Sequence, residues 1–380
     1  MIQVARAGTG IPHWSNELEL ATRMARSRWT RRRLFGMAAG AAAAVWAGRY
    51  GGARAAAESG GVIALPRARD IALVRPDGSE DRTLLTLQQG EFVADVALSP
   101  DGTRVAFGLF TARPGDGGGG SDIVVAPTEP GAARTVLVPR DRAGMLLAAP
   151  HWAPDGSALV FEGVGLSATG QASVTAEWVA ADGSGRRVIA TSGRYPSFSP
   201  DGKSVVYTKA LPTGDSLMMQ PLDGGEGREV VPDSAFLLIT YPRFSPDGQS
   251  IAFTAVANAP ATVPPGLPGP FGTPGPAGSP TVPNGPGVPK SILTGPGGGA
   301  GDARSVLAHG FPAEPFAVPV AGGDARRLAP LPIDDAAIAW SPDGASVAVS
   351  GANGLFVVNV ADGSFRRVSE NGSFGAIDWR

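Results

Sequence analysis

A four-residue turn recurs five times in this chain and constrains its fold more than any other feature. The turn reads Ser-Pro-Asp-Gly in four copies and Ala-Pro-Asp-Gly in one, and the copies contain Asp101, Asp155, Asp201, Asp247 and Asp343. Successive aspartates are 54, 46, 46 and 96 residues apart, so the last interval is one period plus about 50 residues. A period near 46 residues indicates a repeat architecture in which each unit packs on its neighbours.

Short apolar runs flank every turn. Val96–Leu98 precedes the first copy and Val105–Phe107 follows it, and the other four copies have equivalent runs. Proline fixes φ, aspartate bonds back to the chain and glycine takes the left-handed conformation, so each copy predicts a β-hairpin. We interpret the five aspartates as structural turn residues and not as a ring of metal ligands.

A second half-repeat follows each hairpin. It consists of an apolar strand, a glycine-containing turn, an arginine three or four residues after the glycine, and another apolar strand. Its six copies begin at Ile71, Ile123, Ala176, Leu217, Phe316 and Leu355. Four strands per unit, without helical periodicity, predict an all-β fold of the β-propeller type.

The two ends of the repeat region complete each other. The region begins with Val62–Leu65, a second strand without its first, and finishes with Ala376–Arg380, a first strand without the rest. Together they make one composite blade. We therefore predict a six-bladed β-propeller of four-stranded blades over residues 56–380, closed by pairing the N-terminal strands with the C-terminal strand. Closure removes exposed sheet edges.

The repeat resembles that of the TolB-like, WD-repeat-like β-propellers. Blades of that family carry a W/F-S-P-D-G hairpin, an aliphatic strand and a D-G-x-x-R turn. The resemblance covers residues 61–380 apart from one insertion. The resemblance implies the propeller fold. It does not single out a function, because propellers of this type serve as scaffolds, receptors, peptidase gates and lyases.

The insertion is a Pro/Gly-rich tract at 257–313, within the fifth blade. Between Pro260 and Gly301 it holds 12 Pro and 12 Gly in 42 residues. Such a composition cannot bury enough apolar surface to order itself, so we expect a disordered loop.

Residues 1–55 read as an export signal. The charge-free run Leu34–Gly48 is too short to span a bilayer, and Ala55-Ala56 is the expected cleavage site. The residues before the run resemble a twin-arginine (Tat) signal in either of two registers; they are Arg31, Arg32, Arg33, Leu34 and Phe35. An ordinary secretory signal, an uncleaved membrane anchor and translation from Met24 instead of Met1 are the alternatives.

Cleavage would leave an acidic chain. The remaining 23 basic and 32 acidic groups give a formal charge near −9, which argues against binding to nucleic acid or to an anionic membrane. We expect a periplasmic or extracellular protein. Its contacts would be with the twin-arginine translocase during export, with the membrane only transiently through the signal, and with an envelope protein or peptide afterwards.

The position four residues before each turn aspartate is a candidate binding ring. It lies on the innermost strand of each blade, and it is polar in three members: His151, Arg243 and, by equivalence, Asp378. Because propeller sites gather near the axis, we expect these three to bind a ligand at the channel. The alternative is that they bond between blades or face solvent.

No catalytic set accompanies this ring. The chain has no Cys and three His, which are His13, His151 and His309. The run Gly214–Leu217 matches the nucleophile block of one esterase family but lacks an activating His. We therefore expect no catalytic residue, metal or cofactor, and a non-catalytic propeller that binds an envelope protein or peptide. The alternative is a propeller enzyme or binding protein acting on a saccharide or small molecule at the channel.

Overall fold

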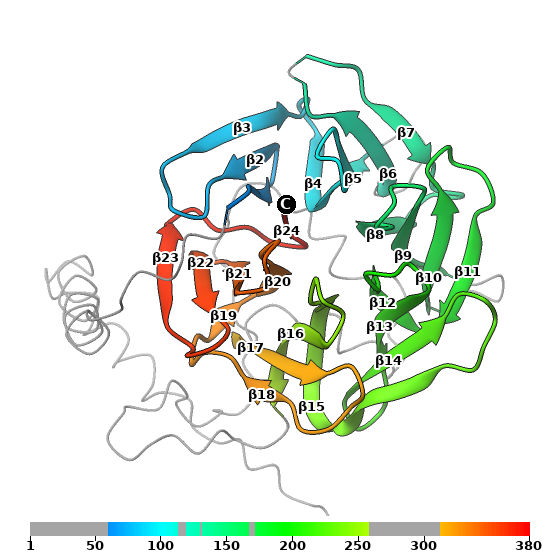
Figure 1. The fold of residues 1–380 in the computed structure, drawn as a ribbon. Helices are drawn as coiled ribbons and strands as arrows, with labels where there is room; N and C mark the ends of the chain where they lie inside the picture. The colour runs from blue at the N-terminus through cyan, green and yellow to red at the C-terminus, as the bar shows by residue number, and fades with distance from the viewer. Residues whose placement is uncertain (1–59, 113–118, 130, 167–171, 258–311) are drawn as a thin grey trace, which may run out of the picture. The chain divides into compact units, whose positions relative to one another are not determined.

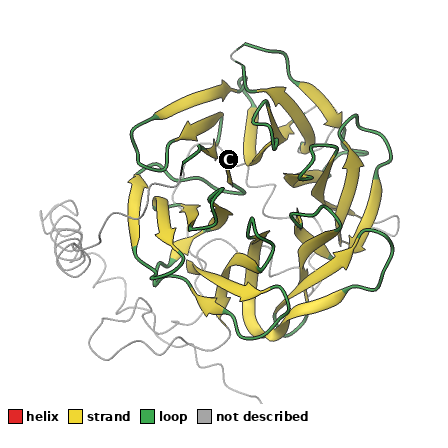
Figure 2. Ribbon diagram, viewed as in Figure 1, coloured by secondary structure: helices red, strands yellow, loops and turns green. Residues whose placement is uncertain are grey.

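The computed structural model describes residues 60–112, 119–129, 131–166, 172–257 and 312–380, all of which belong to the compact unit Ala55–Arg380. Every regular element in these ranges is a β-strand (Figures 1 and 2). They include no helix that could cross a bilayer. The strands form sheets arranged radially around one axis, so the predicted all-β propeller fold is confirmed.

Four of the sheets have four antiparallel strands each. From the axis outward, they are β24 (Asp378–Trp379), β1 (Ile63–Arg67), β2 (Asp70–Val74) and β3 (Asp81–Thr86); β4 (Glu91–Leu98), β5 (Arg104–Thr111), β6 (Gly120–Pro127) and β7 (Thr135–Val138); β8 (Leu146–Trp152), β9 (Ala158–Leu166), β10 (Ala172–Ala180) and β11 (Arg187–Thr191); and β20 (Ala337–Trp340), β21 (Ser346–Gly351), β22 (Gly354–Asn359) and β23 (Phe365–Ser369).

The fifth sheet has eight strands. They are β12 (Gly193–Phe198), β13 (Ser204–Ala210), β14 (Asp215–Pro221), β15 (Arg228–Phe244), β16 (Ser250–Ala257), β17 (Pro312–Pro319), β18 (Arg326–Arg327) and β19 (Ile333–Asp334). The 17-residue strand β15 holds this sheet together, because its first part pairs with β14 and its last part with β16.

Strands β16 and β17 pair in register although the Pro/Gly-rich tract separates them in the sequence. Ser250 pairs with Pro319 and Ala255 with Glu314. The tract therefore connects two neighbouring strands of one sheet. Apart from its ends, the predicted insertion at 257–313 lies outside the described residues, and so does the predicted signal at 1–55.

The innermost strands form a closed ring. Strands β4, β8, β12, β15, β20 and β24 contact one another in that order, and β24 contacts β4. The C-terminal strand closes the ring, because β24 pairs with β1. Trp379 lies opposite Ile63, and Asp378 lies opposite Ala64. The Arg380 amide also donates to the Val62 carbonyl over 3.0 Å. Both ends of the repeat region thus lie in one sheet.

The Pro-Asp-Gly turns are uniform and pack against one another. In each, the glycine amide donates to the carbonyl three residues earlier over 2.8–2.9 Å, and the glycine φ lies between 68° and 71°. A Cβ at Gly202 would lie 3.6 Å from Pro154 of the preceding turn, and one at Gly344 would lie 3.6 Å from Pro246. The turns therefore line one face of the ring in sequence order.

Large apolar side chains three residues before each turn aspartate pack between neighbouring sheets. Trp152 is 1% exposed and Trp379 2% exposed. The Nε1–H of Trp152 donates to the Ala97 carbonyl over 3.2 Å, and that of Trp340 donates to the Arg243 carbonyl over 3.0 Å. Each indole thus joins its own sheet to the preceding one.

The arginines of the second half-repeat join the sheets at the rim. Arg326 donates to the Val360 carbonyl over 2.9 Å, and Arg366 donates to the Pro76 carbonyl. Each bond runs to the glycine turn of the next sheet, because a long guanidinium side chain can span the gap between outer strands. Arg228 makes the same kind of bond to the Val320 carbonyl, whereas Arg82, Arg134 and Arg186 form ion pairs with nearby carboxylates.

Replacing Trp379 by Ala tests the closure. The change removes a side chain that is 2% exposed and its hydrogen bond to the Gly60 carbonyl, so we expect the free energy of unfolding in urea to fall by about 3–5 kcal/mol. Phe374→Ala is the control, because Phe374 is 56% exposed and its loss should change little. Equal effects of the two substitutions would contradict the packing described here.

Candidate binding site on the propeller axis

Four innermost strands have a shift in pairing register at equivalent positions, just before the predicted ring residue. The pairing register shifts between Val93 and Val96, Ala148 and His151, Arg194 and Ser197, and Thr240 and Arg243. A β-bulge of this kind bends a strand and re-aims its side chains. At three of the four shifts a non-glycine residue takes positive φ: Ala149 (48°), Tyr195 (51°) and Tyr241 (49°). Such φ values are strained for a bulky residue, and strain of this kind gathers at functional sites.

The three predicted ring residues lie within electrostatic reach of one another. They come from different strands, His151 from β8, Arg243 from β15 and Asp378 from β24. The charge of Arg243 acts on His151, and that of Asp378 acts on Arg243. Arg380, which the sequence analysis did not single out, acts on both His151 and Arg243 and pairs with Asp378 over 3.3 Å. We call these four residues the axial cluster.

Two members of the axial cluster bond between sheets. Asp378 accepts a hydrogen bond from the Leu98 amide over 2.8 Å, and Nδ1 of His151 accepts one from the Phe198 amide over 3.3 Å. Both amides belong to the neighbouring innermost strand. Burial lowers the pKa of His151 well below 6.5, and the nearby guanidinium groups lower it further, so this imidazole is neutral and acts as an acceptor.

Arg243 has no comparable partner. Its side chain is buried, with the residue 6% exposed, and its one described hydrogen bond is from Nη1 to the Pro242 carbonyl over 3.1 Å. Its Nε is buried and has no hydrogen-bond partner among the described residues. Burial lowers its pKa, and Asp378 acts in the opposite direction. Ser197 holds the equivalent position on β12, and its buried Oγ is also without a partner among the described residues.

Three buried carboxylates accept main-chain amides further from the turns. Asp95 accepts the amides of Ala149 over 3.0 Å and Ala376 over 2.7 Å. Oε2 of Glu162 accepts the Tyr195 amide over 3.0 Å. Oδ2 of Asp215 accepts the Ile239 amide over 2.9 Å. Asp95 and Glu162 therefore join different sheets, whereas Asp215 and Ile239 belong to the same eight-stranded sheet.

Two tyrosines and one arginine pack beside these carboxylates. The Tyr195 and Tyr241 ring centroids are 4.4 Å apart, and Arg194 donates to the Tyr195 hydroxyl over 2.8 Å. Arg194 also lies 3.6 Å from Glu162. Burial raises the pKa of Asp95, while its two amide donors and the Tyr241 hydroxyl hold it down. We call Asp95, Glu162, Arg194, Tyr195, Asp215 and Tyr241 the tyrosine cluster.

The tyrosine cluster was not predicted, although part of its signal is present in the sequence. The position six residues before the turn aspartate reads Asp95, Tyr195 and Tyr241 in three repeats. These polar residues stand two positions before the predicted ring, and each lies within the register shift of its strand, so simple alternation does not fix the face that it occupies. Glu162, Arg194 and Asp215 have no repeat signal of this kind.

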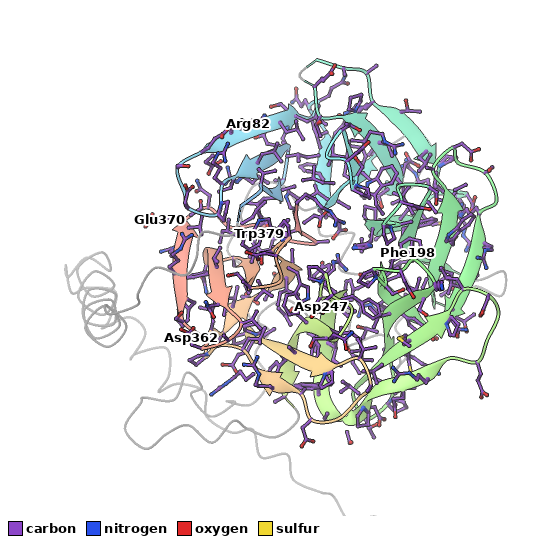
Figure 3. All side chains as sticks on the ribbon, viewed as in Figure 1. Arg82, Phe198, Asp247, Asp362, Glu370 and Trp379 are labelled. Carbon is purple, nitrogen blue, oxygen red and sulfur yellow. The ribbon has the colours of Figure 1, made fainter. Side chains whose placement is uncertain are left out.

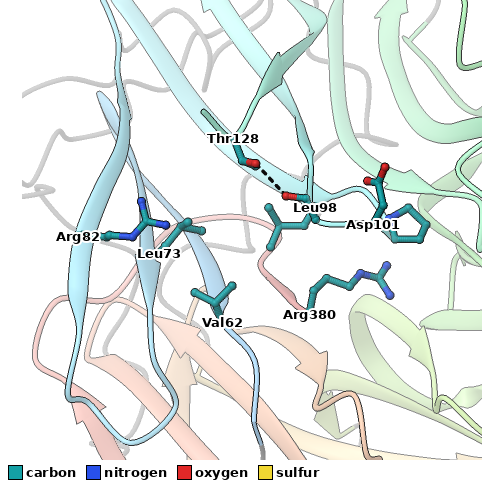
Figure 4. A pocket seen from close by; sticks show the side chains of 9 residues that line it. Val62, Leu73, Arg82, Leu98, Asp101, Thr128 and Arg380 are labelled. Atoms are coloured by element: carbon teal, nitrogen blue, oxygen red, sulfur yellow. Dashed lines mark hydrogen bonds between the residues drawn. The ribbon is translucent and has the colours of Figure 1, made fainter. Parts of the chain in front are cut away.

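A cavity of about 340 Å³ opens beside the axial cluster (Figure 4). Val62, Leu73 and Leu98 give it apolar walls, and Arg82, Asp101 and Arg380 add charged groups. It lies next to Gly102, where a Cβ would contact nothing within 4 Å, unlike the four later turn glycines. The cavity thus occurs where no preceding Pro-Asp-Gly turn packs on Gly102.

The turn aspartates are engaged in their own hairpins. Asp101 accepts from the Ser99 hydroxyl and from Thr103, and these bonds lower its pKa to about 2. Asp155, Asp201, Asp247 and Asp343 each accept the amide two residues later. Among the residues the structure describes, no group of three or more His, Asp or Glu could hold a metal ion.

The remaining predicted residues divide into two groups. Ser216, in the esterase-like run, is fully buried and donates to Glu229 over 2.7 Å. The export-signal residues Arg31–Phe35 and the cleavage pair Ala55-Ala56 lie outside the described residues.

The fold is similar to that of solved β-propellers. TolB from Acinetobacter baumannii superimposes with a TM-score of 0.58 at 16% identity, covering 88% of this chain and 70% of that one. A chain in a nidogen/laminin complex gives 0.55 at 11% identity, covering 84% and 98%. No family model and no curated protein matches the sequence. At these identities the likeness shows the propeller fold alone.

The neutral state of His151 has a consequence for stability. Its folded pKa lies below its unfolded pKa, so the unfolded chain takes up the proton first and stability is lost as the pH falls below about 6.5. Relative to His151→Gln, we expect the wild-type free energy of unfolding to drop by about 1 kcal/mol between pH 8 and pH 5.5. Glutamine can still accept the Phe198 amide, and the comparison cancels the carboxylates common to both proteins. Parallel pH profiles would show that His151 titrates normally.

Proposed function

We propose that this chain is an exported, non-catalytic, six-bladed propeller that binds an envelope protein or peptide at the axial cluster. The observation that carries the proposal is Arg243, a buried guanidinium with one main-chain hydrogen bond, placed among three other polar groups at the ring of innermost strands. A buried charge without a close counter-ion is costly to the fold, so its presence at the axis favours a binding role.

The proposed six blades require that the eight-stranded sheet be two blades sharing β15. The early part of β15 would be the outer strand of one blade, and the part from Phe236 to Phe244 the innermost strand of the next. The spacing of the Pro-Asp-Gly turns supports this division, because Asp201 and Asp247 stand one period apart. The ring of β4, β8, β12, β15, β20 and β24 supports it as well.

The bonding of the axial cluster supports binding over catalysis. General base catalysis of a nucleophile needs the two groups within hydrogen-bond reach of each other. His151 and Asp378 instead accept main-chain amides, and the one described hydrogen bond of Arg243 goes to a main-chain carbonyl. These contacts position the side chains without activating one of them.

Capture from the native envelope tests the proposal. The tagged full chain is cross-linked in cells, purified, and its co-purifying proteins are identified by mass spectrometry. We expect one dominant protein, which is lost with the combined variant His151→Ala, Arg243→Ala, Asp378→Ala and also with Arg243→Ala alone.

The control carries Asp362→Ala and Glu370→Ala, two exposed substitutions at the rim of the ring (Figure 3). It should capture the partner as the wild type does. Recovery of the chain alone, or a partner retained by a folded triple variant, would contradict the proposed site.

The export route is tested separately. Changing Arg31, Arg32 and Arg33 together to lysine covers both registers of the twin-arginine pair and conserves the charge. We expect the chain to accumulate inside the cell, measured by fractionation. Arg26→Lys with Arg28→Lys is the matched control and should leave export unchanged. Normal export of the triple lysine variant would indicate an ordinary secretory signal.

A further inference from the structure

We propose that the axial cluster is a receptor for a single carboxylate group, with the Arg243 guanidinium as its main donor. The proposal deepens the function above by naming the chemistry of the bound group, and it rests on that function for the peptide or protein that carries the carboxylate. The N–H groups of Arg243 that have no hydrogen-bond partner among the described residues are the ones that could bind this carboxylate.

The guanidinium of Arg243 has donors left over. An arginine side chain carries five N–H donors, and the described hydrogen bonds of Arg243 use only Nη1. Nε has no partner, and no described bond uses Nη2. Because Nε is fully buried, a ligand reaches Arg243 at the Nη1–Nη2 end of the guanidinium, where a carboxylate can also make two parallel hydrogen bonds.

No carboxylate of the described residues neutralises Arg243 by direct contact. Asp378 and Asp95 act on it electrostatically, yet neither forms an ion pair with it. Asp378 is occupied by the amides of Leu98 and Trp379 and by Arg380. Asp95 is occupied by two amides and the Tyr241 hydroxyl. A ligand carboxylate would supply the direct counter-ion that the described residues do not.

The surrounding charges favour a group with one negative charge. Arg243 and Arg380 face one carboxylate, Asp378, within the axial cluster, and His151 is neutral. The tyrosine cluster, further along the axis, adds Asp95, Glu162 and Asp215 against one guanidinium, Arg194. These acids would repel a second negative charge, so a carboxylate fits better than a phosphate dianion. A peptide C-terminus and an Asp or Glu side chain both supply it.

Binding of small probes to the purified full chain tests this directly. The probes are N-acetyl-triglycine as the free acid, the same peptide as its amide, sodium acetate and inorganic phosphate, each titrated by calorimetry. We expect the free acid to bind more tightly than phosphate and the amide not to bind. Arg243→Gln should weaken the affinity for the free-acid peptide by about tenfold or more, which is the usual effect of losing a charged hydrogen bond.

Comparing the acid peptide with acetate distinguishes the possible sources of the carboxylate. Tighter binding of the acid peptide than of acetate supports a peptide-borne group, and equal binding supports the carboxylate site with a small acid as its source. The matched control is Arg187→Gln on the outer strand β11, where the exposed guanidinium lies over the Trp178 ring; it should not change binding. Equal binding of acid and amide, or an unchanged affinity in Arg243→Gln, overturns the proposal.

The stability of Arg243→Met provides a second readout. Because the wild-type charge is buried with one hydrogen bond, an apolar side chain of similar length should give a Tm equal to or above that of the wild type without ligand. The bond from Trp340 to the Arg243 carbonyl uses the main chain and is retained. A Tm lower by several degrees would show that Arg243 serves the fold and would overturn the receptor role.

The two proposals fail in different ways. If the envelope partner is captured by Arg243→Gln as well as by the wild type and the acid probe does not bind, the carboxylate receptor is wrong and the interaction function stands. If the acid probe binds through Arg243 and no partner is captured, the carboxylate receptor stands and the interaction function is wrong.

Discussion

The structure depends on side chains of one sheet accepting the main-chain amides of another along the axis. An innermost strand has only one neighbour within its sheet, so half of its amides point away from that neighbour. In this ring, the amides of Leu98 and Phe198 are taken by Asp378 and His151, and those of Ala149 and Tyr195 by Asp95 and Glu162. Because each bond crosses from one sheet to another, it both satisfies a buried amide and fixes neighbouring sheets together.

The same requirement makes the axis polar and therefore suited to binding. Side chains that cap these amides need an acceptor atom, and in this ring Asp378, His151, Asp95 and Glu162 supply it, so polar groups gather where the sheets converge. The bulges in the inner strands add to this, because they turn side chains such as Tyr195 and Tyr241 toward one another. Arg243 differs from His151 and Asp378 of the predicted ring, because a guanidinium has only donors and cannot cap an amide. Its place in a ring of acceptors is the feature that the fold does not explain.

The fold was predictable to a large extent because its determinants are local. The Pro-Asp-Gly turns and the flanking apolar runs predict hairpins, and the recurring spacing predicts radial repetition. The position of His151, Arg243 and Asp378 on innermost strands followed from the same register. Arg380 and the tyrosine cluster were not predicted. Arg194, Glu162 and Asp215 stand at unrelated places in the sequence, and the bulges that bring the inner strands into contact leave no mark in a binary pattern of apolar and polar residues.

The sequence alone determined the strand hairpins, the repeat and the partners of the chain ends, since these follow from turn chemistry and apolar spacing over short distances. Only the tertiary structure decided which polar groups of the axis are satisfied and which are not. That distinction depends on contacts between residues such as Leu98 and Asp378, which are 280 positions apart, and on the burial that shifts the pKa of His151 and isolates the guanidinium of Arg243. Burial and long-range pairing arise only when the sheets pack together, because the residues that make these contacts come from repeats far apart in the sequence.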